Sequence, residues 1–193
     1  MRMLDALRAL ARHRGDAVVV PTMSSLRLWP LVSDREALDL PLFGAMGKAS
    51  SLGLGVALAR PERRVVVLDG DGSLLMNLGS LVTIANLSPR NLVHVVFQND
   101  VYATTGGQPV PGAGGVDFAG MALAAGYRRA ATYTDLAEWE AALPAALEDP
   151  GPALLCLRVE AREEMPPFPA RKTAEAWKQV RAALIGREAT SRR

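Results

Sequence analysis

The feature that most constrains the fold is an unbroken apolar run at residues 65–68, Val-Val-Val-Leu. A strand with one face in water alternates apolar and polar residues. This run does not alternate, so it predicts a strand that is buried on both faces. Short segments at residues 17–20, 91–99, 127–133 and 152–159 are expected to be further strands. Helical patterns separate these segments, and the alternation predicts a doubly wound, mostly parallel α/β sheet.

The expected helices have apolar residues at helical spacing, or are bounded by capping and stop residues. They cover residues 4–11, 48–60, 73–88, 117–126, 134–149 and 173–186. The fifth of these helices is expected to break near Pro144. Residues 22–42, which contain Pro30 and Pro41, and the glycine-rich residues 99–116 are expected to lack regular structure.

Length and composition fit one domain of 193 residues, with residues 162–193 as a C-terminal extension that ends in a helix. The net charge is only +2 and no basic run is interleaved with aromatic residues, so we expect no nucleic-acid partner. No apolar stretch approaches the roughly 20 residues of a membrane span. With Cys156 as the single cysteine, we expect a reducing, cytoplasmic setting, and His94 is expected to be a core histidine.

Two aspartates and two glycines follow the central apolar run, as Asp69-Gly70-Asp71-Gly72, and Ser73 then opens a helix. Glycines permit a sharp turn, and the free N–H groups at the start of a helix attract anions. A carboxylate beside an anion needs a cation between them, and Mg²⁺ binds few carboxylates together with phosphate oxygens. Asp71 is therefore a candidate ligand for Mg²⁺ beside a phosphate group. An ordinary Asp-Gly turn is the alternative, and Asp69 has no assigned role.

A second polar loop begins where the next strand ends, and Asn99 follows Asp71 by 28 residues. That spacing holds one helix and one strand, so both side chains are expected at neighbouring carboxyl ends of the sheet, where ligands bind. An amide oxygen, a loop carbonyl, a carboxylate, two diphosphate oxygens and a water would complete the octahedron that Mg²⁺ prefers. A surface turn rich in Gly and Asn is the alternative.

These stretches resemble the signature of thiamine diphosphate-dependent enzymes, which begins Gly-Asp-Gly and ends in paired asparagines. Here Gly-Asp-Gly is residues 70–72, while Gln98 and Asn99 stand at the paired positions. The resemblance implies that Mg²⁺ binds to Asp71, Asn99 and the main-chain oxygen of Val101. It implies that the thiamine diphosphate is held by Gly70, Gly72 and Ser73.

Residues 43–59 resemble the segment that grips the aminopyrimidine ring in these enzymes. By that match, Met46 is the apolar wedge that bends the cofactor, and the Gly44 carbonyl and the Met46 N–H bond the pyrimidine edge. Core packing is the ordinary alternative for a methionine. The resemblance also implies that Tyr102 binds the cofactor from the loop that covers it, with polar contacts within the loop as the ordinary alternative. Lys48 stands where the family has a neutral residue or histidine, and is the candidate for contacting a substrate anion, with an exposed helix charge as the alternative.

Most of the chain resembles one branch of this family, the beta subunits of sulfopyruvate decarboxylase and the matching half of phosphonopyruvate decarboxylase. The shared stretches are "GAMGKASSLGLGVALA", "DGDGSLLMNLGSLVTIA" and "NDVYATTGGQP", whereas "PTMSSLRLW" departs from the family's Gly-containing opening. The resemblance implies a diphosphate-binding (PP-type) fold. It also implies decarboxylation of an anionic 2-oxo acid, 3-sulfopyruvate or 3-phosphonopyruvate, to carbon dioxide and an aldehyde.

Enzymes of this family also need a domain that binds the aminopyrimidine and supplies a glutamate, for which 193 residues leave no room. Glu163 and Glu164 lie in a proline-rich link and are expected to be solvated charges. The resemblance therefore implies a separate pyrimidine-binding alpha subunit in a hetero-oligomer, which could also contain a homodimer of this chain.

Two other functions stay open. The first is the diphosphate-binding half of an acetolactate synthase-like carboligase, which would consume an acceptor aldehyde or keto acid. The second is a non-catalytic cofactor-binding or scaffolding subunit, which would keep its role without Asp71. A Rossmann nucleotide binder is disfavoured because "GLGVALA" does not complete the Gly-x-Gly-x-x-Gly pattern.

Overall fold

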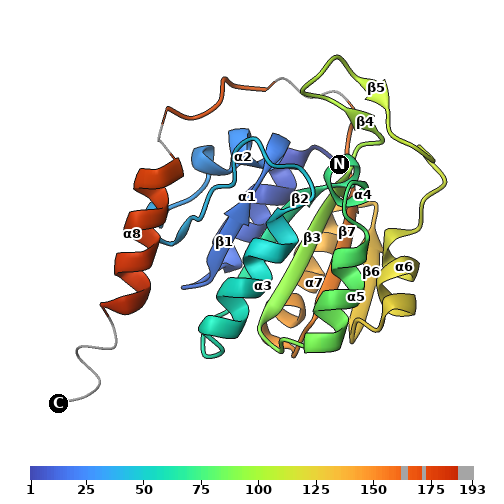
Figure 1. Cartoon of the computed structure of the whole chain (residues 1–193). Coiled ribbons are helices and arrows are strands. Elements are labelled where there is room, and N and C mark those ends of the chain that lie inside the picture. The colour runs from blue at the N-terminus through green and yellow to red at the C-terminus, as the bar shows by residue number, and fades with distance from the viewer. Residues whose placement is uncertain (162–164, 171–172, 187–193) are drawn as a thin grey trace.

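The computed structural model of the chain describes residues 1–161, 165–170 and 173–186. At its centre lies a sheet of five parallel strands (Figure 1). Their order is β1 (Val18–Pro21), β2 (Val65–Gly70), β3 (Leu92–Gln98), β7 (Ala153–Arg158) and β6 (Arg129–Tyr133). The chain thus winds from one edge to the centre, crosses to the other edge and returns. The expected doubly wound, parallel α/β sheet is confirmed.

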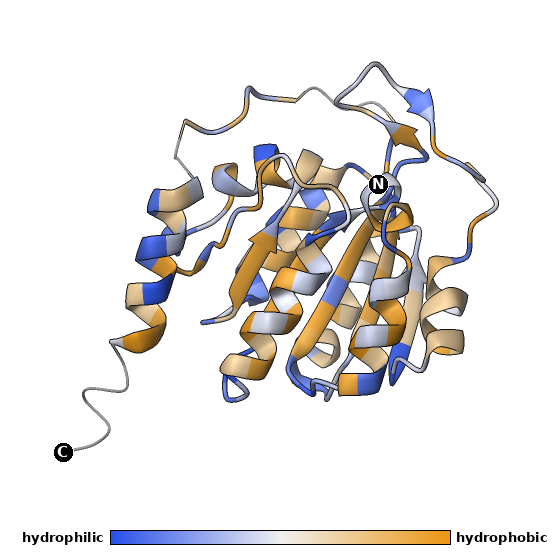
Figure 2. Ribbon diagram, viewed as in Figure 1, coloured by the Kyte–Doolittle hydropathy of each residue, from blue (hydrophilic) through white to orange (hydrophobic). Residues whose placement is uncertain are grey.

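Helices cover both faces of the sheet, as Figure 1 shows. One layer consists of α1 (Met3–His13) and α7 (Leu136–Glu148), and the other consists of α3 (Ala49–Ala59), α5 (Gly79–Leu87), α6 (Phe118–Ala125) and α8 (Thr173–Ile185). Strand β2 supplies both cores, because Val65 and Val67 face the second layer while Val66 and Leu68 face the first. Figure 2 shows that the central strands are largely apolar, with a hydrophilic band within β3. This double burial explains the absence of alternation in the sequence.

Helix α3 packs directly against β2 at Gly53, where a side chain would not fit. A Cβ at Gly53 would overlap a methyl of Val67. On the same helix a Cβ at Gly55 would meet no atom within 4 Å. The glycines of this segment therefore differ in purpose, and only Gly53 is needed for helix-to-sheet packing.

The expectation of irregular structure at residues 22–42 is wrong in part. Helix α2 (Met23–Leu28) starts directly after β1, and the short 3₁₀ turns Trp29–Leu31 and Glu36–Leu38 follow it. Thr22 and Ser25 form a capping box in which each binds the other's backbone, and the helix buries its apolar residues against the sheet. The prolines in this segment lie beyond α2, so they do not prevent it.

The single helix expected at residues 73–88 is two helices, α4 (Asp71–Leu75) and α5, with a turn between them. At the turn the Asn77 side chain donates a 2.8 Å hydrogen bond to the carbonyl of Gly47. This contact with a distant segment redirects the chain, and local helix propensity did not reveal it. Because α4 begins at Asp71, the aspartate lies at the start of the helix and not ahead of it.

Two further expectations are corrected. Residues 99–116 contain a small antiparallel hairpin, β4 (Val101–Tyr102) and β5 (Gln108–Pro109). Helix α7 runs unbroken through Pro144, whose side chain is exposed, so that the carbonyl left without its usual partner can be solvated. Glu163 and Glu164 lie outside the described residues. Among the described helices, none is long and apolar enough to span a bilayer.

Candidate functional site

A cleft opens at the carboxyl ends of β1, β2 and β3, the edge at which doubly wound sheets bind ligands. Its walls come from three consecutive strand ends and from the loop before α3. They are formed by residues 22–25, 69–73 and 101–104 together with Met3, Met46, Phe97 and Asn99. The two polar loops that the sequence placed at neighbouring strand ends therefore do meet.

Asp71 is buried at the floor of this cleft, with only 2% of its surface exposed. Its carboxylate accepts a 2.8 Å hydrogen bond from the N–H of Gly72 and a 2.7 Å hydrogen bond from the N–H of Asp100. Burial raises the pKa of Asp71, and it outweighs these two hydrogen bonds, which lower it. A buried carboxylate that is bound by neutral N–H groups is stabilised further by a cation.

Asn99 and Val101 lie across the turn from Asp71 and line the same cleft. The side-chain oxygen of Asn99 accepts a 3.3 Å hydrogen bond from the N–H of Val101. The Val101 carbonyl accepts one of 3.1 Å from the N–H of Ala103. Each oxygen has a second lone pair, so both can also bind a hard cation.

The start of α4 is closely covered by the hairpin. A Cβ at Gly72 would lie 2.5 Å from Cε1 of Tyr102 and 3.0 Å from a methyl of Val110. Tyr102 thus packs on the glycine itself, and no other residue fits there without moving the ring. At Gly70 a Cβ would meet nothing within 4 Å, so the backbone beside the cleft stays open to a ligand.

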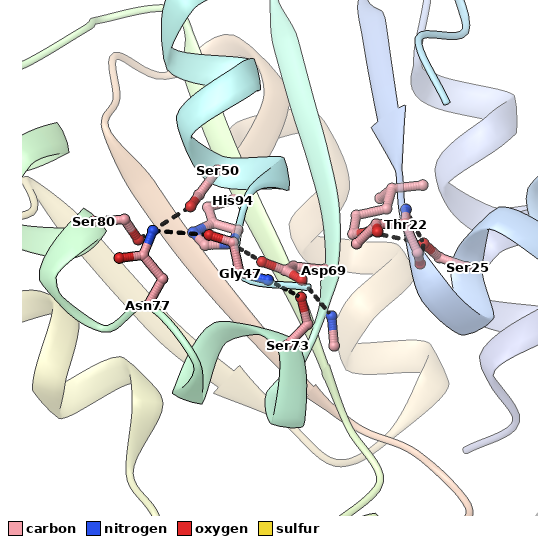
Figure 3. Close-up of polar contacts among 11 residues, drawn as sticks. Thr22, Ser25, Gly47, Ser50, Asp69, Ser73, Asn77, Ser80 and His94 are labelled. Atoms are coloured by element: carbon pink, nitrogen blue, oxygen red, sulfur yellow. Dashed lines mark hydrogen bonds and ion pairs between the residues drawn. The ribbon is translucent and has the colours of Figure 1, made fainter. Parts of the chain in front are cut away.

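Ser73 joins this turn to the loop before α3. Its hydroxyl accepts a 2.9 Å hydrogen bond from the N–H of Gly47, and the Gly47 carbonyl accepts the bond from Asn77 (Figure 3). Gly47 has a φ of +72°, a left-handed conformation that favours glycine. These bonds hold Met46, next in the chain, at the cleft, where it is half-buried.

Two residues implied by the resemblance lie outside the cleft wall. Gly44 is exposed and has a φ of +72°. Lys48 is exposed at the start of α3. Neither is among the described residues that line the cleft. Their proposed contacts with the pyrimidine and with a substrate anion therefore remain predictions.

Residues 22–25 also form a wall of the cleft, which was not predicted from the sequence. Thr22 donates from its hydroxyl to the carbonyl of Leu42, and Ser25 donates to that of Leu68, so these side chains tie α2 to the strands. Met23 has a φ of 52°, an uncommon value for a residue with a side chain. The signal in the sequence was Thr22 and Ser25, hydroxyl residues three apart in "TMSS" immediately after a buried strand.

Asp69, which had no assigned role, has hydrogen-bond partners different from those of Asp71. One carboxylate oxygen accepts a 2.9 Å hydrogen bond from the N–H of Gly70, and the other lies 3.4 Å from Nε2 of His94 (Figure 3). Both side chains are completely buried. His94 is thus a core histidine, as expected, and it lies beside a buried carboxyl group that the sequence pattern did not reveal.

The residues present fit a metal-bound diphosphate. The residues that line the cleft offer a buried carboxylate (Asp71), an amide oxygen (Asn99) and a main-chain carbonyl (Val101), and hard oxygen donors of this kind suit Mg²⁺. At Gly70, just before α4, the backbone beside these residues is open, so a phosphate group can approach it.

Comparison with known proteins gives a consistent result. Residues 18–157 match the family "Thiamine pyrophosphate enzyme, C-terminal TPP binding domain". A phosphonopyruvate decarboxylase of Streptomyces viridochromogenes is 46% identical over 154 residues, which are 79% of this chain and 38% of that protein. A sulfopyruvate decarboxylase beta subunit of Methanothermobacter thermautotrophicus is 66% identical over 67 residues, 35% of this chain and 36% of the subunit.

Among solved structures, benzoylformate decarboxylase from Polynucleobacter necessarius is similar in fold. It superposes with a TM-score of 0.69 at 22% identity, over 85% of this chain and 34% of that chain. The alignments thus span less than two fifths of the length of these relatives.

Proposed function

Because the chain belongs to the thiamine pyrophosphate enzymes and carries their C-terminal cofactor-binding domain, we propose that it is the diphosphate-binding half of a 2-oxo acid decarboxylase. Its substrate would be an anionic 3-substituted pyruvate, 3-sulfopyruvate or 3-phosphonopyruvate. The observation that carries this proposal is the meeting of Asp71, Asn99 and Val101 in one cleft. Residues 1–193 would form one domain, with 162–193 as an extension whose Trp177 donates to the carbonyl of Pro41.

In this proposal Asp71, Asn99 and the Val101 carbonyl hold Mg²⁺. Gly70, Gly72 and Ser73 receive the diphosphate. Thiamine diphosphate, when bound, supplies the electron sink that decarboxylation requires. The protein's role is to hold the Met46 loop and the diphosphate turn in fixed positions relative to each other.

Two contacts in the chain support that positioning role. The hydrogen bond between the Gly47 N–H and Ser73 Oγ fixes the Met46 loop against the diphosphate turn. The ring of Tyr102 covers Gly72 and shields the turn from water. Positioned groups of this kind lower the cost of orienting reactants.

We further propose that a separate alpha subunit completes the site. Among the described residues that line the cleft, the acidic ones are aspartates, and no glutamate is present to activate an aminopyrimidine. Met76, just before α5, is 57% exposed, and Val82, on α5, is 61% exposed. Exposed apolar side chains near an incomplete active site are typical of a surface that a partner subunit covers. The short alignments with longer relatives also fit a chain that supplies one part of an enzyme.

A reconstitution experiment tests this function. We expect the chain alone, with thiamine diphosphate and Mg²⁺, to release no carbon dioxide. With a pyrimidine-binding subunit from the same organism, it should release carbon dioxide from 3-sulfopyruvate or 3-phosphonopyruvate, and Asp71→Ala should abolish this. Robust turnover by the chain alone would refute the two-subunit arrangement.

The same assay separates the alternatives. Consumption of an acceptor aldehyde or keto acid by the reconstituted pair would identify a carboligase. Full biological function of the Asp71→Ala variant would identify a non-catalytic subunit. Lys48→Ala is the variant for the substrate anion: if Lys48 contacts that anion, KM should rise for the sulfonate or phosphonate and change little for pyruvate.

A further inference from the structure

We propose that Gln98 is a positioning residue: it clamps Asp100 and so holds the turn that carries Asn99 and Val101 in place for the metal. This inference rests on the proposed function, because it concerns the same metal site. Gln98 itself contacts neither proposed ligand through its side chain. It acts through Asp100, the residue between the two ligands.

The side chain of Gln98 is fixed at both ends. It lies at the end of β3 with 2% of its surface exposed. Its amide nitrogen donates a 3.0 Å hydrogen bond to the carboxylate of Asp100 and lies 3.5 Å from the carbonyl of Val116. Its amide oxygen accepts a 3.2 Å bond from the thiol of Cys156 on β7. A buried amide whose groups are all engaged holds its partners in one arrangement.

Asp100 is the residue that needs holding. Its φ is 61°, in the left-handed region that residues with a side chain rarely adopt. Its N–H donates the 2.7 Å hydrogen bond to Asp71, and its carbonyl accepts a 3.0 Å bond from Val110, which closes the hairpin. The position of this one residue therefore links the carboxylate ligand, the amide ligand and the hairpin.

Charge gives the clamp a second purpose. A free carboxylate at position 100 could turn toward a bound cation and compete with the intended ligands. The hydrogen bond from Gln98 directs it away from the cation. Asparagine, which the resemblance places at position 98, is one methylene shorter and reaches less far.

Reversing the hydrogen bond tests the clamp. Gln98→Glu sets two carboxylates against each other, whereas Gln98→Glu combined with Asp100→Asn restores a donor–acceptor pair with the opposite direction. Asp100→Asn alone keeps an acceptor for Gln98. Gln179→Glu, on the exposed face of α8, adds the same charge far from the cleft and serves as the control.

Two readouts at pH 8 follow the turn directly. NMR hydrogen exchange of the position-100 amide, without cofactor, reports its bond to Asp71. Titration with Mn²⁺ in the presence of thiamine diphosphate, followed by electron paramagnetic resonance, reports the metal site. We expect Gln98→Glu to speed the exchange and weaken Mn²⁺ binding, each by on the order of 10-fold or more, because a hydrogen bond to a charged group is lost. The double variant should recover most of both losses.

Several outcomes decide the matter. Unchanged exchange and Mn²⁺ affinity in Gln98→Glu, or a double variant no better than Gln98→Glu, would overturn the inference. So would a loss of thermal stability in Gln98→Glu with no specific change at the position-100 amide. If the wild-type chain binds no Mn²⁺ with thiamine diphosphate, either alone or with its partner subunit, the proposed function fails. The exchange measurement then still decides whether Gln98 holds the turn.

Discussion

The two glycines of the cleft turn should respond in opposite ways to the same added methyl group. Gly70 has φ −107° and ψ 155°, which alanine adopts readily, and its Cβ would meet nothing within 4 Å. At Gly72 the Cβ would lie 2.5 Å and 2.9 Å from two ring carbons of Tyr102 and 3.0 Å from Val110. Ordinary carbon contacts lie near 3.5–4.0 Å, so at Gly72 the ring must move by about 1 Å.

The expected free energies of unfolding follow from this geometry. Gly70→Ala should stabilise the cofactor-free chain by about 0.4–1 kcal/mol, because it restricts the unfolded chain without strain. Gly72→Ala should gain about as much stability from the higher helix propensity of alanine as Gly70→Ala gains. It should also lose about 1–3 kcal/mol of stability because the added methyl group overpacks the site. The net loss at Gly72 is about 1 kcal/mol, which for a chain of this length lowers the Tm by about 2–4 °C.

Thermal unfolding with and without thiamine diphosphate and Mg²⁺ measures both effects. When the concentration of thiamine diphosphate is 100 times its Kd, binding should raise the free energy of unfolding of the wild-type chain by about 2.7 kcal/mol. Gly70→Ala should lose most of this gain despite its stable fold, because its methyl lies in open space beside the cleft. A Tyr102→Ala background should reduce the damage of Gly72→Ala. If Gly72→Ala proved as stable as Gly70→Ala, or if Gly70→Ala kept the full ligand gain, the reasoning would be refuted.

Three further expectations concern the fold. Cys156 is buried and burial raises the pKa of its thiol to about 12, so iodoacetamide should label it only at the rate of unfolding. Tyr127→Phe should stabilise the chain by about 1 kcal/mol in denaturant titrations, because the described structure gives the buried hydroxyl no hydrogen-bond partner. Burial also raises the pKa of Tyr127, so the wild-type tyrosine ionises first in the unfolded state and stability falls as the pH rises above about 10. The phenylalanine variant should lack this part of the alkaline loss. Gly53→Ala should cost about 1–3 kcal/mol by overlapping Val67, whereas Gly55→Ala should gain about 1 kcal/mol, and equal melting temperatures would contradict the proposed packing.

Most of the sheet could be predicted because its buried strands consist mainly of apolar residues. An apolar run that ignores alternation, such as residues 65–68, has no stable place except between two helix layers. Helices with a clear N-cap residue and a clear stop residue were also predictable. In α6 these residues are Asp117 at the N-cap and Gly126 at the C-cap. In these elements local propensity and tertiary packing agree.

The errors fall where a contact from elsewhere in the chain decides the local structure. Nothing in residues 73–88 shows that Asn77 binds the carbonyl of Gly47, and that bond accompanies the turn between α4 and α5. The capping box at Thr22 and Ser25 was visible in principle, yet nearby prolines made the segment look irregular. The strand-end loops were placed correctly, because parallel strands fix which ends meet whatever the loops do in between.

Asp69 and Asp71 have different surroundings although they are only two residues apart. Residue 69 shares the parity of Val65 and Val67, so its side chain faces the layer of α3, where parallel pairing with β3 brings His94 close. Asp71 escapes this alternation because α4 begins there and turns its carboxylate to the cleft. The strand period alone would have put both aspartates on one face. Because α4 starts at Asp71, the Asp69 carboxylate is hydrogen-bonded inside the fold while that of Asp71 stays available to a cation.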